Sequence, residues 1–214
     1  MNRTELLMEY YRAMYAALGP SHWWPAESAF EVCIGAVLTQ NTNWTNVSRA
    51  IEALREQDLL TPQGLEGLTE AQLAELIRPT GYFRVKASRI KALLDFLGRE
   101  ARYDLNRLAQ QPLEEVRAKL LAVKGIGQET ADSILLYALG QPVFVVDAYT
   151  ARIMHRHAFV PEDVNYGQLQ EMFTDNLPSD VQVFNEYHAL LVRVGKRWCK
   201  KSSPVCKDCP LGQF

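Results

Sequence analysis

The sequence has neither a long apolar run nor an excess of positive charge. No stretch approaches the roughly 18 uncharged apolar residues of a membrane-spanning helix, and Glu5 and Glu9 interrupt the N-terminal apolar residues, so no secretory signal is expected. Lys and Arg number 23 against 25 Asp and Glu, and a net charge of -2 excludes a uniformly basic nucleic-acid-binding arm. We therefore expect a cytoplasmic protein without a membrane partner.

Cysteine is scarce and unevenly placed. Three of the four cysteines, Cys199, Cys206 and Cys209, fall in the last sixteen residues, while Cys33 stands alone upstream and is predicted to be a small buried apolar residue. Without export signals a disulfide is disfavoured. Hydrophobic residues make up 48% of the chain, which is enough for a sizeable core.

Strand signals are also scarce, and apolar residues recur mostly at helical spacing. Near the N-terminus Leu6, Tyr10, Met14 and Leu18 form such a stripe. Helices are predicted over 2–18, 30–38, around 51–54, 70–77, 85–100, 113–122, 131–139, 149–157, 166–175 and 180–195. The β-branched run 143–146 is too isolated to predict a sheet, so the predicted fold class is all-α.

A glycine turn joins two of these predicted helices. Gly125 and Gly127 permit positive φ and expose backbone amides at the start of the second helix, where a phosphate can bind. An ordinary helix–helix turn is the alternative. The candidate DNA-binding residues of this turn are Val123, Gly125, Gly127, Gln128 and Thr130.

Asp147 follows the 143–146 run and immediately precedes a predicted helix. Aspartate is a preferred N-cap at such a position. A carboxylate there is also well placed to stabilise positive charge that develops beside DNA. Both interpretations stay open.

The ordered motifs resemble those of the endonuclease III superfamily of DNA glycosylases. The resemblance rests on GAVLTQNTNW from residue 35, RPTGYFRVKASRI from residue 78, VKGIGQETADSILLYALGQPVFVVDAY from residue 123, and the cysteine tail. It implies two helical domains with the active site in the cleft between them. These would be a six-helix barrel with a helix-hairpin-helix over 22–134 and a second domain from 1–21 and 135–214 with the cysteine loop.

In bifunctional members of that superfamily, the fifth position of G-x-G-x-K is a lysine that forms a Schiff base. This chain has Glu129 there, and a carboxylate cannot form an imine. The sequence therefore predicts a monofunctional glycosylase that hydrolyses the N-glycosidic bond with water, unless a lysine such as Lys124 substitutes.

The resemblance also assigns roles around the extruded nucleotide. Asp147 would stabilise the oxocarbenium-like sugar and orient water. Gln40 and Tyr82 match positions that fill the gap left by the flipped base. The alternatives are an amide that satisfies loop backbone for Gln40 and a half-buried ring for Tyr82.

Aromatic residues suggest the class of base. Trp23, Trp24, Pro25 and Trp44 bracket one apolar helix, and core packing is the plain interpretation. Alternatively they line a pocket, because an indole face attracts a cationic alkylated base by roughly 0.5–2 kcal/mol. The motifs are similar to those of the 3-methyladenine DNA glycosylase branch, where these positions line the pocket. Lys196 matches a pocket lysine there, with a solvated or phosphate-facing lysine as the alternative.

The tail spacing Cys199-x6-Cys206-x2-Cys209 reproduces three ligands of the superfamily's [4Fe-4S] loop, and the fourth would fall at position 215. We expect a [4Fe-4S] cluster. Its loss stays open, as does zinc held by these cysteines and a distant histidine such as His188.

Basic residues cluster twice, either as phosphate contacts or as solvated helical faces. The clusters are Arg78, Arg84, Lys86, Arg89 and Lys91, and Arg193, Lys196, Arg197, Lys200 and Lys201. The predicted protein is a monomeric glycosylase acting on damaged, alkylated bases in double-stranded DNA. The alternatives are a glycosylase for oxidised or mismatched bases, a non-catalytic helix-hairpin-helix module, and a small iron–sulfur electron carrier.

Overall fold

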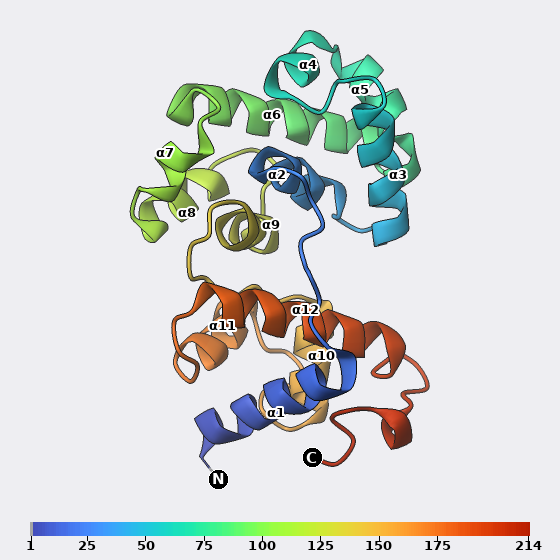
Figure 1. Cartoon of the computed structure of the whole chain (residues 1–214), viewed down its shortest axis with the longest axis vertical. Helices are drawn as coiled ribbons and strands as arrows, with labels where there is room; N and C mark the ends of the chain where they lie inside the picture. The colour runs from blue at the N-terminus through green and yellow to red at the C-terminus, as the bar shows by residue number, and fades with distance from the viewer. Residues whose placement is uncertain (1) are drawn as a thin grey trace. The chain divides into compact units, whose positions relative to one another are not determined.

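The computed structural model describes residues 2–214, in which helices are joined by turns and no residue lies in a strand (Figure 1). This confirms the all-α prediction. No helix within these residues is both long and apolar enough to cross a membrane.

The chain forms two compact units. The central unit is Ala26–Gln141, and the terminal unit combines the segment up to Pro25 with Pro142–Phe214. We predicted domain boundaries after residues 21 and 134, so both observed boundaries lie further along the chain. At the second boundary, the Gln141 side chain donates hydrogen bonds to the carbonyls of Ala109 (3.2 Å) and Gln111 (2.9 Å), which keeps it with the central unit.

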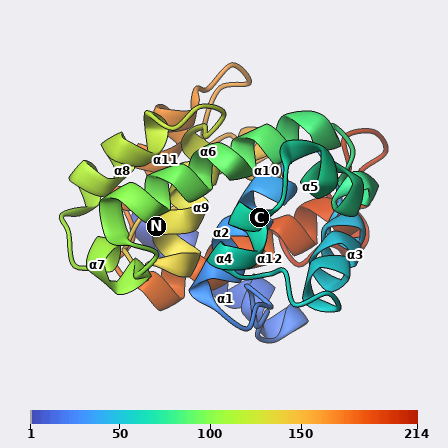
Figure 2. The ribbon, with the colours of Figure 1, turned by 90° about the horizontal axis from the view of Figure 1, so that it is seen from above.

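The central unit surrounds one apolar helix. Its helices are α2 (Ala29–Leu38), α3 (Trp44–Arg55), α4 (Pro62–Gly67), α5 (Glu70–Leu76), η1 (Arg78–Thr80), α6 (Phe83–Ala101), α7 (Leu105–Ala109), α8 (Leu113–Leu121), α9 (Gln128–Ser133) and the π-helical η2 (Ile134–Ala138). Every α2 residue from Glu31 to Leu38 is buried, and α2 packs on α3, α6, α9 and η2. In Figure 2, α6 runs along this unit from the α5 end to the α7 end.

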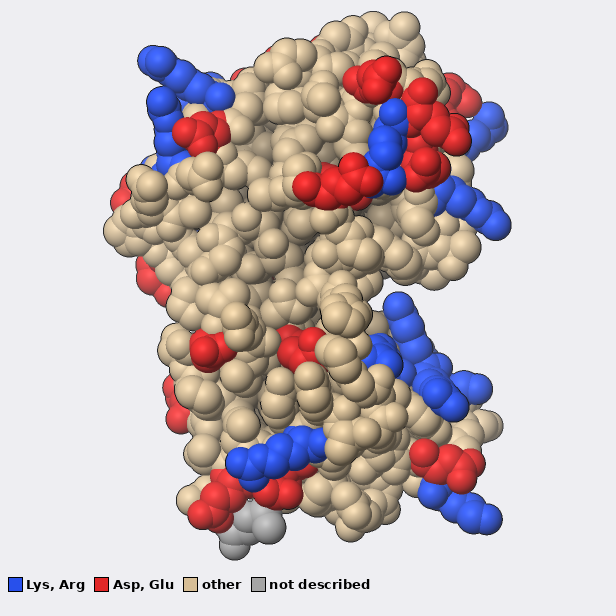
Figure 3. Space-filling view, viewed as in Figure 1, with Lys and Arg blue, Asp and Glu red and all other residues tan. Residues whose placement is uncertain are grey.

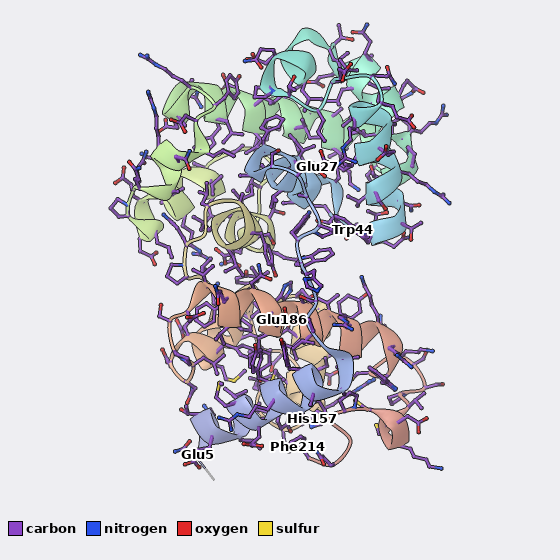
Figure 4. All side chains as sticks on the ribbon, viewed as in Figure 1. Glu5, Glu27, Trp44, His157, Glu186 and Phe214 are labelled. Atoms are coloured by element: carbon purple, nitrogen blue, oxygen red, sulfur yellow. The ribbon has the colours of Figure 1, made fainter. Side chains whose placement is uncertain are left out.

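The terminal unit packs around α12. It contains α1 (Arg3–Leu18), α10 (Ala148–Arg156), α11 (Tyr166–Thr174), α12 (Val181–Arg197) and the short η3 (Cys206–Asp208). The Phe144 and Phe173 rings stack with centroids 4.0 Å apart, and the Tyr187 hydroxyl donates to the Leu7 carbonyl at 2.7 Å. Glu186 of α12, labelled in Figure 4, accepts hydrogen bonds from the amide and hydroxyl of Ser21.

Two features of the backbone differ from the expected pattern. The short helices α4 and α7 were not predicted, because five or six residues carry too little apolar periodicity. The predicted helix over 131–139 begins earlier, at Gln128, and changes to π-helical geometry at Ile134. The 143–146 run is buried and, among the described residues, belongs to neither a helix nor a strand, as expected.

Candidate active site

Helices α8 and α9 form the hairpin that the glycine turn predicts. They are joined by a buried ion pair, in which the Arg117 guanidinium donates to both carboxylate oxygens of Asp132 at 2.7 and 3.1 Å. The Asp132 side chain is fully buried. Such two-point pairing fixes both distance and orientation, so it holds the two helices of the hairpin in one geometry.

The two glycines of the turn do different things. Gly125 has φ +87°, and a Cβ there would lie 2.4 Å from the Arg89 side chain, so it needs glycine for conformation and for space. Gly127 has φ −94°, which any residue adopts, and nothing lies within 4 Å of where its Cβ would be. The expectation of positive φ therefore holds for Gly125 alone. Gly127 leaves open space before the first amides of α9, at Gln128 and Thr130.

Gln40 joins the loop after α2 to this hairpin. Its amide nitrogen donates to the Gly125 carbonyl (3.2 Å) and the Thr130 hydroxyl (3.0 Å), and its amide oxygen accepts from the Arg89 guanidinium. Three of the predicted DNA-binding residues, Gln40, Gly125 and Thr130, are thus brought together. In this structure Gln40 satisfies loop backbone, which was the alternative to the gap-filling role.

Tyr82 lies on a tight turn between η1 and α6. Gly81 and Tyr82 both have positive φ, 67° and 47°, and the Tyr82 ring is 72% exposed. The half-buried ring considered as the alternative is therefore wrong. An exposed aromatic side chain on a left-handed turn is available to stack against another ring.

Asp147 caps α10 with one carboxylate oxygen. Its Oδ1 accepts from the Thr150 amide (2.7 Å) and the Thr150 hydroxyl (2.9 Å). Its Oδ2 lies 3.8 Å from Nε2 of His188 on α12, and both side chains are about nine-tenths buried. The capping interpretation is confirmed, and the second oxygen has a different neighbour.

The surroundings keep Asp147 ionised. Burial alone would raise the pKa of its carboxyl group, but neighbouring His188 and the two Thr150 donors outweigh burial and lower the pKa below its ordinary value. His188, the distant zinc ligand of the alternative hypothesis, lies beside Asp147 and lowers the pKa of its carboxyl group. Its position on α12, four residues after the buried Phe184, is the sequence signal that it faces the core.

The predicted base-pocket residues lie in both units. Trp23 and Trp24 are half-buried with ring centroids 4.9 Å apart, Pro25 is exposed, and all three belong to the terminal unit. Trp44 is half-buried as the first residue of α3 in the central unit, so none of these tryptophans is a fully buried core residue. Lys196 is exposed on α12.

The three tail cysteines line one cavity of about 430 Å³, together with Ile153 and Arg156 of α10. The Arg156 guanidinium donates to Sγ of Cys199 at 3.3 Å. Burial raises the pKa of Cys209, and the neighbouring cysteines raise it further. Within residues 2–214, no three His, Cys, Asp or Glu side chains are arranged to hold a metal ion. The thiols share a cavity that His188 does not line.

Cys33 is fully buried in α2, and burial raises the pKa of its thiol to about 12. This confirms the expected apolar role, since an inert buried thiol is neither a ligand nor a nucleophile.

Several residues of the two basic clusters are bonded within the protein and are therefore less available to contact phosphates than expected. Lys86 is buried, Arg89 bonds Gln40, and Lys91 donates to the carbonyls of Leu65 and Glu66. Arg193 donates to the carbonyls of Leu18 and Gly19. In this structure these four side chains are therefore engaged within the protein, and phosphate contact by them stays a prediction. The exposed members of the two clusters are Arg78, Arg84, Lys196, Arg197, Lys200 and Lys201. Figure 3 shows a group of basic side chains where α12 ends.

A family match settles the identity of the fold. The family described as HhH-GPD superfamily base excision DNA repair protein matches residues 34–179, which include the hairpin and Asp147. The chain belongs to the HhH-GPD superfamily. Its family is therefore that of the DNA glycosylases of base excision repair, as the sequence motifs predicted.

Several known proteins match most of the chain. A Methanocaldococcus jannaschii protein, whose assignment as a DNA repair glycosylase is provisional, is 42% identical over 215 residues, covering 100% of this chain and 97% of that protein. Endonuclease III of Thermotoga maritima is 31% identical over 186 residues, covering 85% and 80%. The structure of H. pylori 3-methyladenine DNA glycosylase (MagIII) bound to 1,N6-ethenoadenine has a TM-score of 0.80 and 27% identity, covering 92% of this chain and 98% of that one.

Proposed function

We propose that this protein is a monofunctional DNA glycosylase, acting as a monomer, that hydrolyses the N-glycosidic bond of alkylated purines flipped from duplex DNA. The observation that carries the proposal is that the Asp147 carboxylate both caps α10 and is held in its ionised form. Its Oδ1 fixes the carboxylate at the start of α10, while His188 and the Thr150 donors keep it ionised in spite of its burial. A fixed, preorganised negative charge is what a developing sugar cation needs.

Asp147 would then act in two ways. Its charge would stabilise the oxocarbenium-like sugar as the bond to the base breaks, and its oxygen would orient the incoming water. An alkylated purine carries a positive charge and leaves readily, which lowers the need for an acid. Flipping the nucleotide exposes the bond, and unstacking costs a few kcal/mol.

The absence of lyase activity is proposed from Glu129. This residue lies in the first turn of α9, at the position where bifunctional members carry lysine. A carboxylate cannot form a Schiff base with the abasic sugar. Borohydride trapping on abasic DNA tests this, with Lys124→Ala run beside the wild type because Lys124 is exposed in the same turn. Efficient trapping that disappears in Lys124→Ala would identify a lyase and contradict the proposal.

The class of base is proposed from the paired indoles of Trp23 and Trp24. Electron-rich ring faces attract a cationic base, at roughly 0.5–2 kcal/mol for each favourable face. Two further observations support this class. The half-buried rings leave part of their surface available, and a 3-methyladenine glycosylase is among the similar structures. From the sequence resemblance alone, we also propose base contacts for Pro25, Trp44 and Lys196.

The deciding experiment is release of labelled 3-methyladenine and 7-methylguanine from duplex DNA, beside oxidised-pyrimidine and mismatched substrates. We expect release of the alkylated purines by the wild type and loss of release in Asp147→Asn. Release of only oxidised or mismatched bases would assign the alternative glycosylase class. DNA binding without release from any substrate would assign the non-catalytic module.

We also propose that Cys199, Cys206 and Cys209 supply thiolates to a [4Fe-4S] cluster. The cavity they share supports this, although three thiolates fall short of the usual four and form no ligand group by themselves in the described residues. When bound, the cluster would order the tail. Anaerobically purified protein should be brown and absorb broadly in the visible. Cys206→Ser should lose that absorption, while Cys33→Ser, at a buried site outside the cavity, should keep it.

A further inference from the structure

Lys86 is a buried cation that the proposed chemistry does not use. It is the fourth residue of α6, only 1% of its surface is exposed, and the described chain places no carboxylate within 4.0 Å of it. Burial lowers the pKa of its ammonium group to about 8, and nearby Arg89 contributes. Placing a cation in the interior without a counter-charge costs stability.

The side chain of Lys86 joins two loops. Its Nζ donates to the Leu38 carbonyl at 2.9 Å and to the Thr80 carbonyl at 2.8 Å. Leu38 is the last residue of α2, where a carbonyl lacks an intrahelical partner and the helix dipole is negative. Thr80 is the last residue of η1. An ammonium group has three donors and can satisfy both carbonyls at once.

Each of these carbonyls lies two residues before a candidate gap-filling side chain. Gln40 follows Leu38, and Tyr82 follows Thr80. The Tyr82 turn is held from both sides, since the Lys86 amide also donates to the Tyr82 carbonyl at 3.0 Å. Lys86 therefore fixes the left-handed turn that presents the exposed ring, and it ties that turn to the Gln40 loop.

We propose that Lys86 is a positioning residue that holds the Tyr82 turn at a fixed separation from the Gln40 loop, so that the exposed Tyr82 ring enters the gap left by an extruded nucleotide. This role rests on the proposed function, because only a base-flipping protein must fill such a gap. The role is distinct from catalysis, since Lys86 is buried and reaches DNA only through the two loops.

Lys86→Met tests this role, and Lys91→Met is a matched control. Methionine fills a similar volume without a donor. Lys91 lies on the same helix and also donates to two carbonyls, those of Leu65 (2.7 Å) and Glu66 (3.0 Å), which belong to α4 and not to either loop. Thermal unfolding of both variants measures the structural cost of losing a lysine that binds two carbonyls.

Two readouts follow insertion and chemistry separately. A 2-aminopurine placed beside an abasic site in duplex DNA reports unstacking by its fluorescence at saturating protein. Single-turnover release of an alkylated base reports the completed reaction. We expect Lys86→Met to lose most of the fluorescence change and to release base ~10-fold more slowly. The reason is that the Tyr82 side chain is then no longer held in place to fill the gap that unstacking opens. Lys91→Met should resemble the wild type in both.

A double-mutant cycle with Tyr82→Ala decides whether Lys86 acts through the loop. If it does, adding Lys86→Met to Tyr82→Ala should cause little further loss of fluorescence change. Full fluorescence change in a folded Lys86→Met protein would overturn the proposal, as would equal losses in Lys86→Met and Lys91→Met. If Lys86→Met does not fold, Lys86→Gln replaces it in the same comparison. If the wild type releases no base, the proposed function is refuted. The 2-aminopurine fluorescence still tests whether Lys86 positions the Tyr82 side chain for insertion.

Discussion

Nε2 of His188 lies 3.8 Å from the carboxylate oxygen of Asp147 that does not cap α10. Capping and catalysis at Asp147 are therefore compatible, because the two oxygens have different neighbours. The hydrogen bonds from Thr150 fix the Asp147 side chain, and His188 favours its ionised form. A residue that is mostly buried thus presents an ionised carboxylate without losing its structural role.

Asp147→Asn separates these two roles. Asparagine caps a helix about as well as aspartate, so α10 and the fold should be retained, with thermal unfolding close to that of the wild type. The negative charge is lost, and single-turnover base release should fall by ~10²–10⁴-fold. Affinity for undamaged duplex should change little. Release at near wild-type rate would show that the charge of Asp147 is not needed.

His188→Gln should change the pH dependence of base release. His188 lowers the pKa of the Asp147 carboxyl group, so its removal should raise that pKa. The active form is the ionised one, so the acid limb of the single-turnover rate should move to higher pH while the neutral plateau persists. Since the wild-type pKa lies below its ordinary value of 3.8, rates measured from about pH 3 to about pH 8 follow the limb from the wild type to the variant. His155→Gln, at an exposed site on α10, should leave the profile in place.

If the acid limb of His188→Gln stays at the pH of the wild-type limb, Thr150 alone maintains the ionised state of Asp147. Loss of rate at every pH, with the limb unmoved, would point to misplacement of Asp147 instead of a changed pKa.

The sequence predicted the long helices because apolar residues at a period of 3.6 decide them. It also predicted the hairpin and the Asp147 cap, which depend on single residues with strong local preferences. The five- and six-residue helices α7 and α4 escaped because their formation depends on packing. The exposed Tyr82 ring could not be deduced, since its left-handed turn is held by contacts from α6.

Charge was the least predictable property. Lys86 belongs to a run of basic residues that predicts contact with solvent or phosphate, yet it lies in register with the buried Ile90, Leu93 and Leu97 on one face of α6. That spacing was visible in the sequence. The carbonyls that accept from Lys86, Lys91 and Arg193 were not, because they are set by loops distant along the chain.

The two hairpin glycines should respond oppositely to alanine. Gly125→Ala combines positive φ with a clash against Arg89, so we expect destabilisation of ~1–3 kcal/mol. Gly127→Ala has room and an ordinary φ, so stability should change by only about 0.5 kcal/mol. If backbone amides of α9 approach a phosphate, the methyl group should still weaken DNA binding. Equal affinity of Gly127→Ala and wild type in a titration would exclude that close approach.

Salt dependence should follow the exposed basic residues and not the bonded ones. Lys200→Ala removes an exposed cation beyond the end of α12, and the slope of log affinity against log salt should decrease by ~0.9 if it contacts a phosphate. Lys91→Ala removes a lysine engaged with carbonyls, and the slope should stay unchanged. Titrations of duplex DNA at several salt concentrations measure both. A smaller slope in Lys91→Ala would mean that its internal bonds open on binding.

Lys86 should make stability rise with pH in an alkaline window. Burial lowers its pKa from 10.5 to about 8, so between these values the unfolded chain binds more protons than the folded one. The free energy of unfolding then increases with pH across the window, by on the order of 1–3 kcal/mol. Lys86→Met should lack this rise. Tyr10 and Cys33, whose pKa values burial raises to about 12, lower stability at high pH in both proteins and cancel in the comparison. Urea unfolding of both proteins at matched pH values gives the difference in their free energies of unfolding. If the two free energies change with pH in parallel, Lys86 is not desolvated.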